Sequence, residues 1–164
     1  MSVKERFTEE EWSLIRAAPA LIGAGVMASD PGGLISAVKE MAAMGSSTRD
    51  ALKDHENSQL LKAIVEARDE GLKEETRSIV DGATSAMDKR ERLQGGALER
   101  LQQALALLQD KVDPAELAAY KRWVSTMAHR MAEAGKEGGF MGFGGVTITE
   151  SEQAFLDRVE AIMS

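Results

Sequence analysis

Residues 17–29 read A-A-P-A-L-I-G-A-G-V-M-A-S, and these thirteen positions form the longest run in the chain without a charged side chain. Trp12 and Ile15 extend its apolar face upstream at helical spacing. A helix that is apolar on every side is normally buried by its neighbours. The sequence therefore predicts a buried N-terminal helix that begins at Glu9, with the remaining helices packed around it.

Three positions inside this run predict how the helix packs. Pro19 has no backbone N–H to donate, so we expect the helix to kink or break just before it, near Ala17 or Ala18. Gly23 and Gly25 lack side chains and therefore predict the close approach of another helix. Thirteen uncharged residues are too few to cross a bilayer, so we expect no stable membrane insertion.

Helix-start signals occur at both ends of the chain and in its second half. Thr8 with Glu11 and Thr149 with Glu152 have the spacing of capping boxes, in which each residue satisfies a backbone N–H of the other. The sequence D-P-A-E at residues 113–116 predicts a further helix start, because aspartate caps well and proline fits the first helical position.

Between these signals apolar residues recur at helical intervals, and no alternating run is long enough for a strand. A chain of 164 residues is most simply a single domain, here 1–164. We predict an all-α fold, a compact bundle of six or seven helices around the buried N-terminal helix, with a glycine-rich loop before the last helix. The expected helices lie near residues 9–29, 34–44, 58–72, 73–92, 98–112, 114–134 and 150–163, with a brief helical turn through Leu52 to Asp54.

A leucine heptad follows two adjacent glycines, Gly95 and Gly96, which predict either a helix break or a close helix contact. The heptad covers only about two repeats, which is short for a coiled coil between chains. Packing inside the bundle is therefore favoured, and a possible oligomer seam is the alternative. The residues at its a and d positions are Leu98, Leu101, Leu105, Leu108 and Val112.

The stretch at residues 135–152 reads G-K-E-G-G-F-M-G-F-G-G-V-T-I-T-E-S-E, with six glycines in its first eleven positions. Its apolar side chains Phe140, Met141 and Phe143 suit a plug packed against the end of the bundle. They equally suit an exposed contact loop for a partner, because exposed apolar patches mark contact sites. A phosphate-binding loop is disfavoured, because neither a Walker motif nor G-x-G-x-x-G is present.

The sequence offers little for catalysis or metal binding. It has no cysteine, and neither histidine, His55 or His129, belongs to an E-x-x-H or H-E-x-x-H motif. His129 and Glu133 are four residues apart, a spacing that suits a surface pair better than the edge of a metal site. No serine-hydrolase signature is present either. We therefore identify no enzyme, and we expect no cofactor and no tightly bound transition metal.

Charge and the N-terminal sequence bear on partners and location. The formal net charge of −7 disfavours a nucleic-acid partner, because binding to a phosphate backbone needs clustered lysine and arginine. The N-terminus is polar, and no apolar signal-peptide core follows it. We therefore expect a cytoplasmic protein.

Two segments resemble known families. Residues 136–152 resemble a C-terminal signature of small bacterial helical proteins, and V-M-A-S-D-P-G-G-L at 26–34 resembles the acidic turn of the TerB-like domains of tellurite resistance. The second resemblance implies an all-helical fold and a divalent ion near acidic turns. Of those acids only Asp30 is matched, and Pro31 departs from the A-D-G-x-I pattern of the family, so no metal site is carried over.

Together these features favour a non-catalytic protein-interaction or regulatory module of bacterial origin, acting through a protein partner or self-association as a homo-oligomer. The alternative is a protein of TerB-like type that binds a small apolar ligand or a metal ion. A ligand cavity in such a protein would be lined by the 17–29 helix, by Trp123 and by the methionine-rich face of residues 114–134.

Overall fold

The computed structural model describes residues 2–29, 48–50, 52–67, 72–136 and 148–164 and confirms the all-α class, since no residue in these ranges forms a strand. The helical turn expected to end at Asp54 is present at 48–50 and 52–54. The expected helix at 34–44 lies outside the described residues. The helices are η1 (Val3–Arg6), α1 (Glu9–Ser29), α3 (Gln59–Glu66), α4 (Leu72–Val80), α5 (Ala86–Lys111), α6 (Pro114–Lys136) and α7 (Glu150–Met163).

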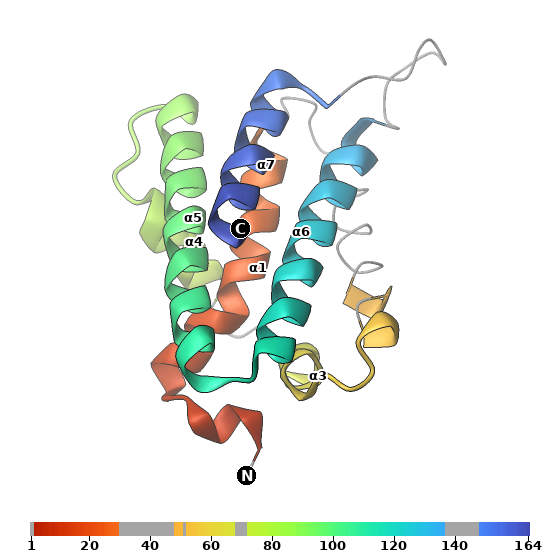
Figure 1. Cartoon of the computed structure of the whole chain (residues 1–164). Coiled ribbons are helices and arrows are strands. Elements are labelled where there is room, and N and C mark those ends of the chain that lie inside the picture. The colour runs from red at the N-terminus through yellow and green to blue at the C-terminus, as the bar shows by residue number, and fades with distance from the viewer. Residues whose placement is uncertain (1, 30–47, 51, 68–71, 137–147) are drawn as a thin grey trace.

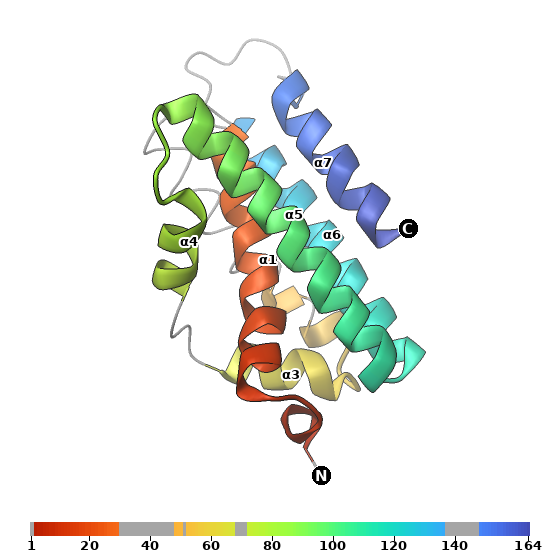
Figure 2. The ribbon, with the colours of Figure 1, turned by 90° about the vertical axis from the view of Figure 1, so that its left-hand side faces the viewer.

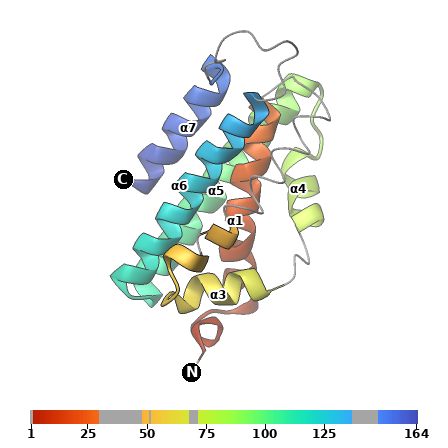
Figure 3. The same cartoon turned by 90° about the vertical axis from the view of Figure 1, so that its right-hand side faces the viewer.

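Helix α1 forms the centre of the bundle, as the sequence predicts. It packs most extensively against α5 and also contacts α6, α7 and α4. In Figure 1, α1, α5, α6 and α7 form one group, in which α1 and α6 run in one direction and α5 and α7 run in the opposite direction. Figure 2 shows α4 flanking this group, and Figure 3 shows α3 lying across its lower end, close to η1. Helix α3 therefore packs against α6 and η1.

The predicted capping signals are confirmed. The Thr8 amide donates to the Glu11 carboxylate at 2.9 Å, and the Glu11 amide donates to the Thr8 hydroxyl at 3.2 Å. Thr149 and Glu152 form the same reciprocal pair at 2.8 and 3.2 Å. Helix α6 begins at Pro114, as expected. Local chemistry therefore determines these helix starts.

Of the kink or break expected at Pro19, the break does not occur, because α1 continues through this residue to Ser29. Proline cannot donate to the carbonyl four residues earlier, which is that of Ile15. The Tyr120 hydroxyl of α6 donates to this carbonyl instead, at 2.8 Å. A neighbouring helix thus replaces the missing backbone hydrogen bond.

Two glycines allow close helix packing. A Cβ atom on Gly25 would lie 2.4 Å from the Phe155 ring of α7, so the predicted close approach at this position is confirmed. On Gly96 a Cβ atom would lie 2.7 Å from the Ile79 side chain of α4. Because α5 runs unbroken through Gly95 and Gly96, the break does not occur. The close-contact alternative holds for Gly96, whereas an added Cβ on Gly95 would have nothing within 4 Å.

The expected single helix over residues 73–92 is wrong. The chain leaves helical geometry after α4 at Gly82, whose φ of 72° suits glycine better than any other residue. Helix α5 then begins after Ser85, whose side chain accepts a hydrogen bond from the Asp88 amide. A turn and a new N-cap therefore interrupt a run whose apolar spacing is helical throughout.

The leucine heptad lies in the core of the single chain. Its four leucines are at most 8% exposed, and its last member, Val112, is partly buried against the same cluster. A surface seam between two chains would need these side chains accessible, so the described structure corrects that alternative. The buried leucines are Leu98, Leu101, Leu105 and Leu108.

Helix α1 is the one helix in the described ranges that is long and apolar enough to cross a membrane by length and composition alone. Of its most apolar window, 56% is buried inside the bundle. The core helix of a soluble protein satisfies the same criteria. The expectation of no stable membrane insertion therefore stays a prediction.

Candidate functional site

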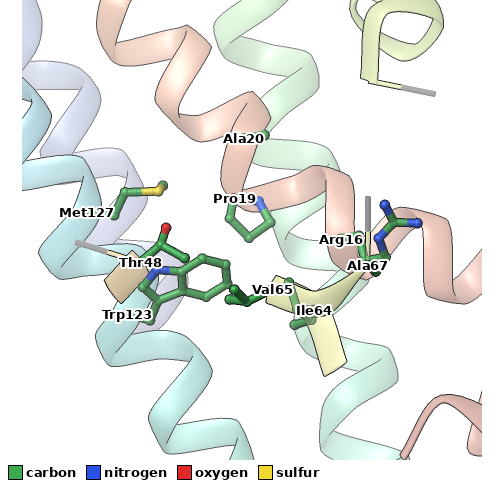
Figure 4. A pocket seen from close by; sticks show the side chains of 9 residues that line it. All are labelled: Arg16, Pro19, Ala20, Thr48, Ile64, Val65, Ala67, Trp123 and Met127. Carbon is green, nitrogen blue, oxygen red and sulfur yellow. The ribbon is translucent and has the colours of Figure 1, made fainter. Parts of the chain in front are cut away.

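A cavity of about 140 Å³ opens between α1, α3 and α6. Figure 4 shows its lining, with Met127, Trp123 and Thr48 at one end and Arg16 and Ala67 at the other. Most of these side chains are apolar, and they come from three helices that are far apart in the sequence. The described residues of the lining are Arg16, Pro19, Ala20, Thr48, Ile64, Val65, Ala67, Trp123 and Met127.

The wall from α1 exists because Pro19 stays within an intact helix. Pro19 and Ala20 belong to the charge-free run, and they present a ring and a methyl group to the cavity. Neither side chain has a polar atom. This wall therefore contributes apolar surface without hydrogen-bonding demands.

The wall from α3 depends on an anchor between α3 and α6. Glu116 of α6 accepts hydrogen bonds from the Gln59 amide at 2.8 Å and the Leu60 amide at 3.3 Å. The Ser58 hydroxyl also donates to this carboxylate. A carboxylate suits the first turn of a helix, where backbone N–H groups lack helical partners. The contact fixes α3 beside α6, with Ile64 and Val65 toward the cavity.

Trp123 forms the third wall with Met127. Its ring packs edge-on against Tyr120, with centroids 6.0 Å apart and an angle of 80° between the planes. The indole Nε1 is buried and has no hydrogen-bond partner within the part of the chain that the structure describes. A buried donor without a partner is uncommon and costs stability. This wall therefore combines apolar surface with one buried N–H donor that has no partner among the described residues.

One residue of the described lining carries a charge. This residue is Arg16, and no carboxylate occurs among the lining residues that the structure describes. Arg16 is partly buried, and both it and Thr48 take part in other interactions within the chain. The described lining therefore combines mostly apolar side chains with one cationic and one hydroxyl-bearing side chain.

His129 does not pair with Glu133. Its Nε2 lies 3.2 Å from Oε1 of Glu160 on α7, and the Ser125 hydroxyl donates to the same oxygen. A catalytic triad needs the histidine between serine and carboxylate, so that it accepts the serine proton. Here the Ser125 hydroxyl donates to the Glu160 carboxylate and not to the histidine. The cluster joins α6 to α7 and has no geometry for nucleophilic catalysis.

No group of three or more histidine, aspartate or glutamate side chains in the described ranges is placed to hold a metal ion. His55 lies in a separate open cavity lined by several acidic residues, and Glu116 there already serves as the cap of α3. Asp30, Phe140, Met141 and Phe143 lie outside the described residues. The plug and contact-loop alternatives for Phe140, Met141 and Phe143 therefore remain predictions.

Sequence reasoning identified part of this cavity. The 17–29 helix, Trp123 and the inner methionine face were expected to line any ligand cavity, and Pro19, Ala20, Trp123 and Met127 do so. The α3 residues Ile64 and Val65 were not predicted to form a wall of this cavity. A signal was available, because adjacent Ile64 and Val65 make the apolar surface of α3 wider than one contact face.

Comparison with protein-family models, with curated proteins and with solved structures finds no match to this chain. Its function is therefore inferred from the cavity and its lining.

Proposed function

We propose that this protein is a non-catalytic binding protein that takes a small, largely apolar ligand into the cavity between α1, α3 and α6. The observation that carries this proposal is a cavity of about 140 Å³ walled by Pro19, Ile64, Val65, Trp123 and Met127. An engineered apolar cavity of about 150 Å³ binds benzene or xenon. The volume therefore suits a ligand body of one ring or a short branched chain.

The cavity has the general character of a small-molecule site. Such sites are concave and mostly apolar, with a few polar groups that fix orientation. Arg16 and Thr48 supply those polar groups at the two ends of the lining (Figure 4). No nucleophile paired with a histidine base occurs among the described residues, since Ser125 donates to Glu160 instead. These features support binding and give no support to catalysis.

The protein-interaction hypothesis remains a second candidate. Among the described residues only two large hydrophobic side chains are exposed, Val65 at 37% and Met87 at 63%, and the heptad is internal. An extended apolar docking surface is therefore not formed by these residues. That hypothesis now depends on Phe140, Met141 and Phe143, and Val65 belongs to the cavity instead.

Binding of benzyl alcohol tests the proposal. When benzyl alcohol is titrated into the protein, two-dimensional amide NMR should show shifts in the signals of residues around Pro19, Ile64 and Trp123. Ala20→Phe fills the cavity from α1 and should abolish these shifts, whereas Ala106→Phe, on the exposed face of α5, should leave them unchanged. If the Ala20→Phe protein is folded and binds benzyl alcohol like the wild type, the ligand binds outside this cavity. Absence of binding to the wild type would overturn the proposal.

A further inference from the structure

The part of the lining formed by Trp123 and Met127 points to a ligand class, an inference that rests on the proposed function. We infer that the cavity selects a small aromatic molecule over a saturated molecule of similar size, and that Trp123 is the residue that determines this selectivity. Trp123 and Met127 are one helical turn apart on α6, and Pro19 adds a saturated ring from α1 (Figure 4).

A ligand in the cavity meets the ring carbons of Trp123. The indole Nε1 is buried, whereas the side chain as a whole lines the cavity. The atoms of Trp123 that border the cavity are therefore carbon atoms of its ring system. Such a surface attracts a second aromatic ring in edge-to-face or offset geometry, beyond the gain from buried area. A saturated ring has no π-system and gains only from the burial of its surface.

The Trp123 ring is held in place before any ligand binds. Tyr120 packs edge-on against it, with 6.0 Å between the ring centroids. Tyr120 is itself fully buried, and its hydroxyl donates to the Ile15 carbonyl of α1. A wall that is already ordered costs little to organise on binding, so the gain from ring contact is retained in the affinity.

Met127 favours the same class of ligand. Its side chain is 1% exposed and lines the cavity at the same end as Trp123 (Figure 4). A thioether sulfur interacts favourably with an aromatic ring about 5 Å away, and a saturated ring does not offer this contact. An aromatic ligand at this end therefore gains from two neighbouring side chains of α6.

Isothermal titration of the wild type with matched alcohols tests the selectivity. Benzyl alcohol should bind about 3- to 10-fold tighter than cyclohexylmethanol, which has the same number of carbon atoms and the same hydroxyl group. Without aromatic contacts the order would be reversed, because cyclohexylmethanol is the more hydrophobic of the two. Cyclopentylmethanol has a smaller ring and controls for exclusion by size. It should also bind more weakly than benzyl alcohol.

Substitutions at Trp123 assign the selectivity to this residue. Trp123→Leu should reduce the preference for benzyl alcohol over cyclohexylmethanol to about 2-fold or less, because Met127 alone then contributes to it. Trp123→Phe keeps an aromatic ring and should retain most of the preference. Both substitutions remove volume from the wall, so the ratio of the two affinities is compared and not either affinity alone.

The outcomes separate this inference from the proposed function. If benzyl alcohol binds to the wild type no tighter than either saturated alcohol, the aromatic class is wrong, while an apolar ligand site remains. If folded Trp123→Leu keeps the full wild-type ratio, the selectivity does not come from Trp123. If none of the three alcohols binds, both the inference and the proposed function fail. The wild-type comparison decides the ligand class even if Trp123→Leu does not fold.

Discussion

The Tyr120 hydroxyl donates a hydrogen bond to the Ile15 carbonyl at 2.8 Å, and this is the carbonyl that Pro19 leaves without a helical donor. Tyr120 is fully buried, and burial raises the pKa of its phenol, so the group stays protonated and remains a donor. The bond lets α1 continue through Pro19. It thereby places the Pro19 ring at the cavity wall beside Trp123 (Figure 4).

Tyr120→Phe should destabilise the protein by about 1–3 kcal/mol, because it leaves a buried carbonyl without a partner. Chemical denaturation measures this change. Pro19→Ala restores a backbone N–H that can donate to the Ile15 carbonyl. It therefore provides a background in which this carbonyl no longer needs the Tyr120 hydroxyl. In Pro19→Ala protein the cost of Tyr120→Phe should fall, and the double-mutant cycle should show coupling between the two sites. An unchanged cost in that background would show that the hydroxyl acts in some other way.

The glycines of α1 and α5 predict opposite responses to alanine. Gly25→Ala should destabilise by about 1–3 kcal/mol through overpacking, because the new methyl group would lie 2.4 Å from the Phe155 ring. Gly95→Ala has nothing within 4 Å of its new Cβ and lies inside a helix. It should stabilise by up to about 1 kcal/mol, since alanine favours helix over glycine.

Phe155→Leu provides the control for the first of these changes. The smaller side chain should recover part of the loss in Gly25→Ala, because it gives the methyl group space. Thermal denaturation of the wild type, Gly25→Ala, Phe155→Leu and the double variant compares these effects. Equal melting temperatures for Gly25→Ala and the wild type would contradict the tight contact between α1 and α7.

The sequence predicted those features of the fold that follow from neighbouring residues. Thr8 with Glu11 and Thr149 with Glu152 form the caps that their spacing indicates. The charge-free run at 17–29 is buried or half-buried throughout, as its lack of charged side chains predicts. The single helix expected over 73–92 is interrupted at Gly82. The prediction followed the helical spacing of the apolar residues and gave too little weight to the turn that glycine favours there.

The cavity was predictable only in part, because it depends on contacts between distant residues. Met127 was identified from the inner face of its helix, and Trp123 was expected to line a cavity from a position off that face. The α3 wall depends on Glu116, whose position in the sequence D-P-A-E indicated a role in its own helix. In the structure this carboxylate holds the start of α3 instead. Likewise, no local pattern relates Tyr120 to the carbonyl freed by Pro19.

The Glu116 anchor should control the local stability of α3. Glu116→Ala removes the acceptor for the Gln59 and Leu60 amides, so hydrogen exchange at both should become faster. Binding of benzyl alcohol should weaken with it, because α3 carries Ile64 and Val65 into the cavity. Glu99→Ala, an exposed position on α5, should change neither property. Unchanged exchange in Glu116→Ala would mean that other contacts hold α3.

Acid should weaken the attachment of α1 to the end of α5. The Lys111 side chain, together with the Thr8 amide, lowers the pKa of Glu11 from its ordinary value of 4.5. Lys111 lies 2.6 Å from the Glu11 carboxylate in this pair. A carboxyl whose pKa is lowered by folding stabilises the protein fully above its ordinary pKa. That contribution is lost as the pH falls through the folded-state value.

Melting temperatures measured from neutral pH down to about pH 3 test this relationship. Glu11→Gln should be less stable than the wild type near neutral pH, and the difference should shrink as the wild-type carboxyl becomes protonated. Glu10→Gln changes the same charge at an exposed neighbouring position and makes a matched control. Its melting temperature should follow the wild-type pH dependence. If Glu11→Gln retains that full dependence as well, the ion pair with Lys111 contributes nothing to the acid sensitivity of the fold.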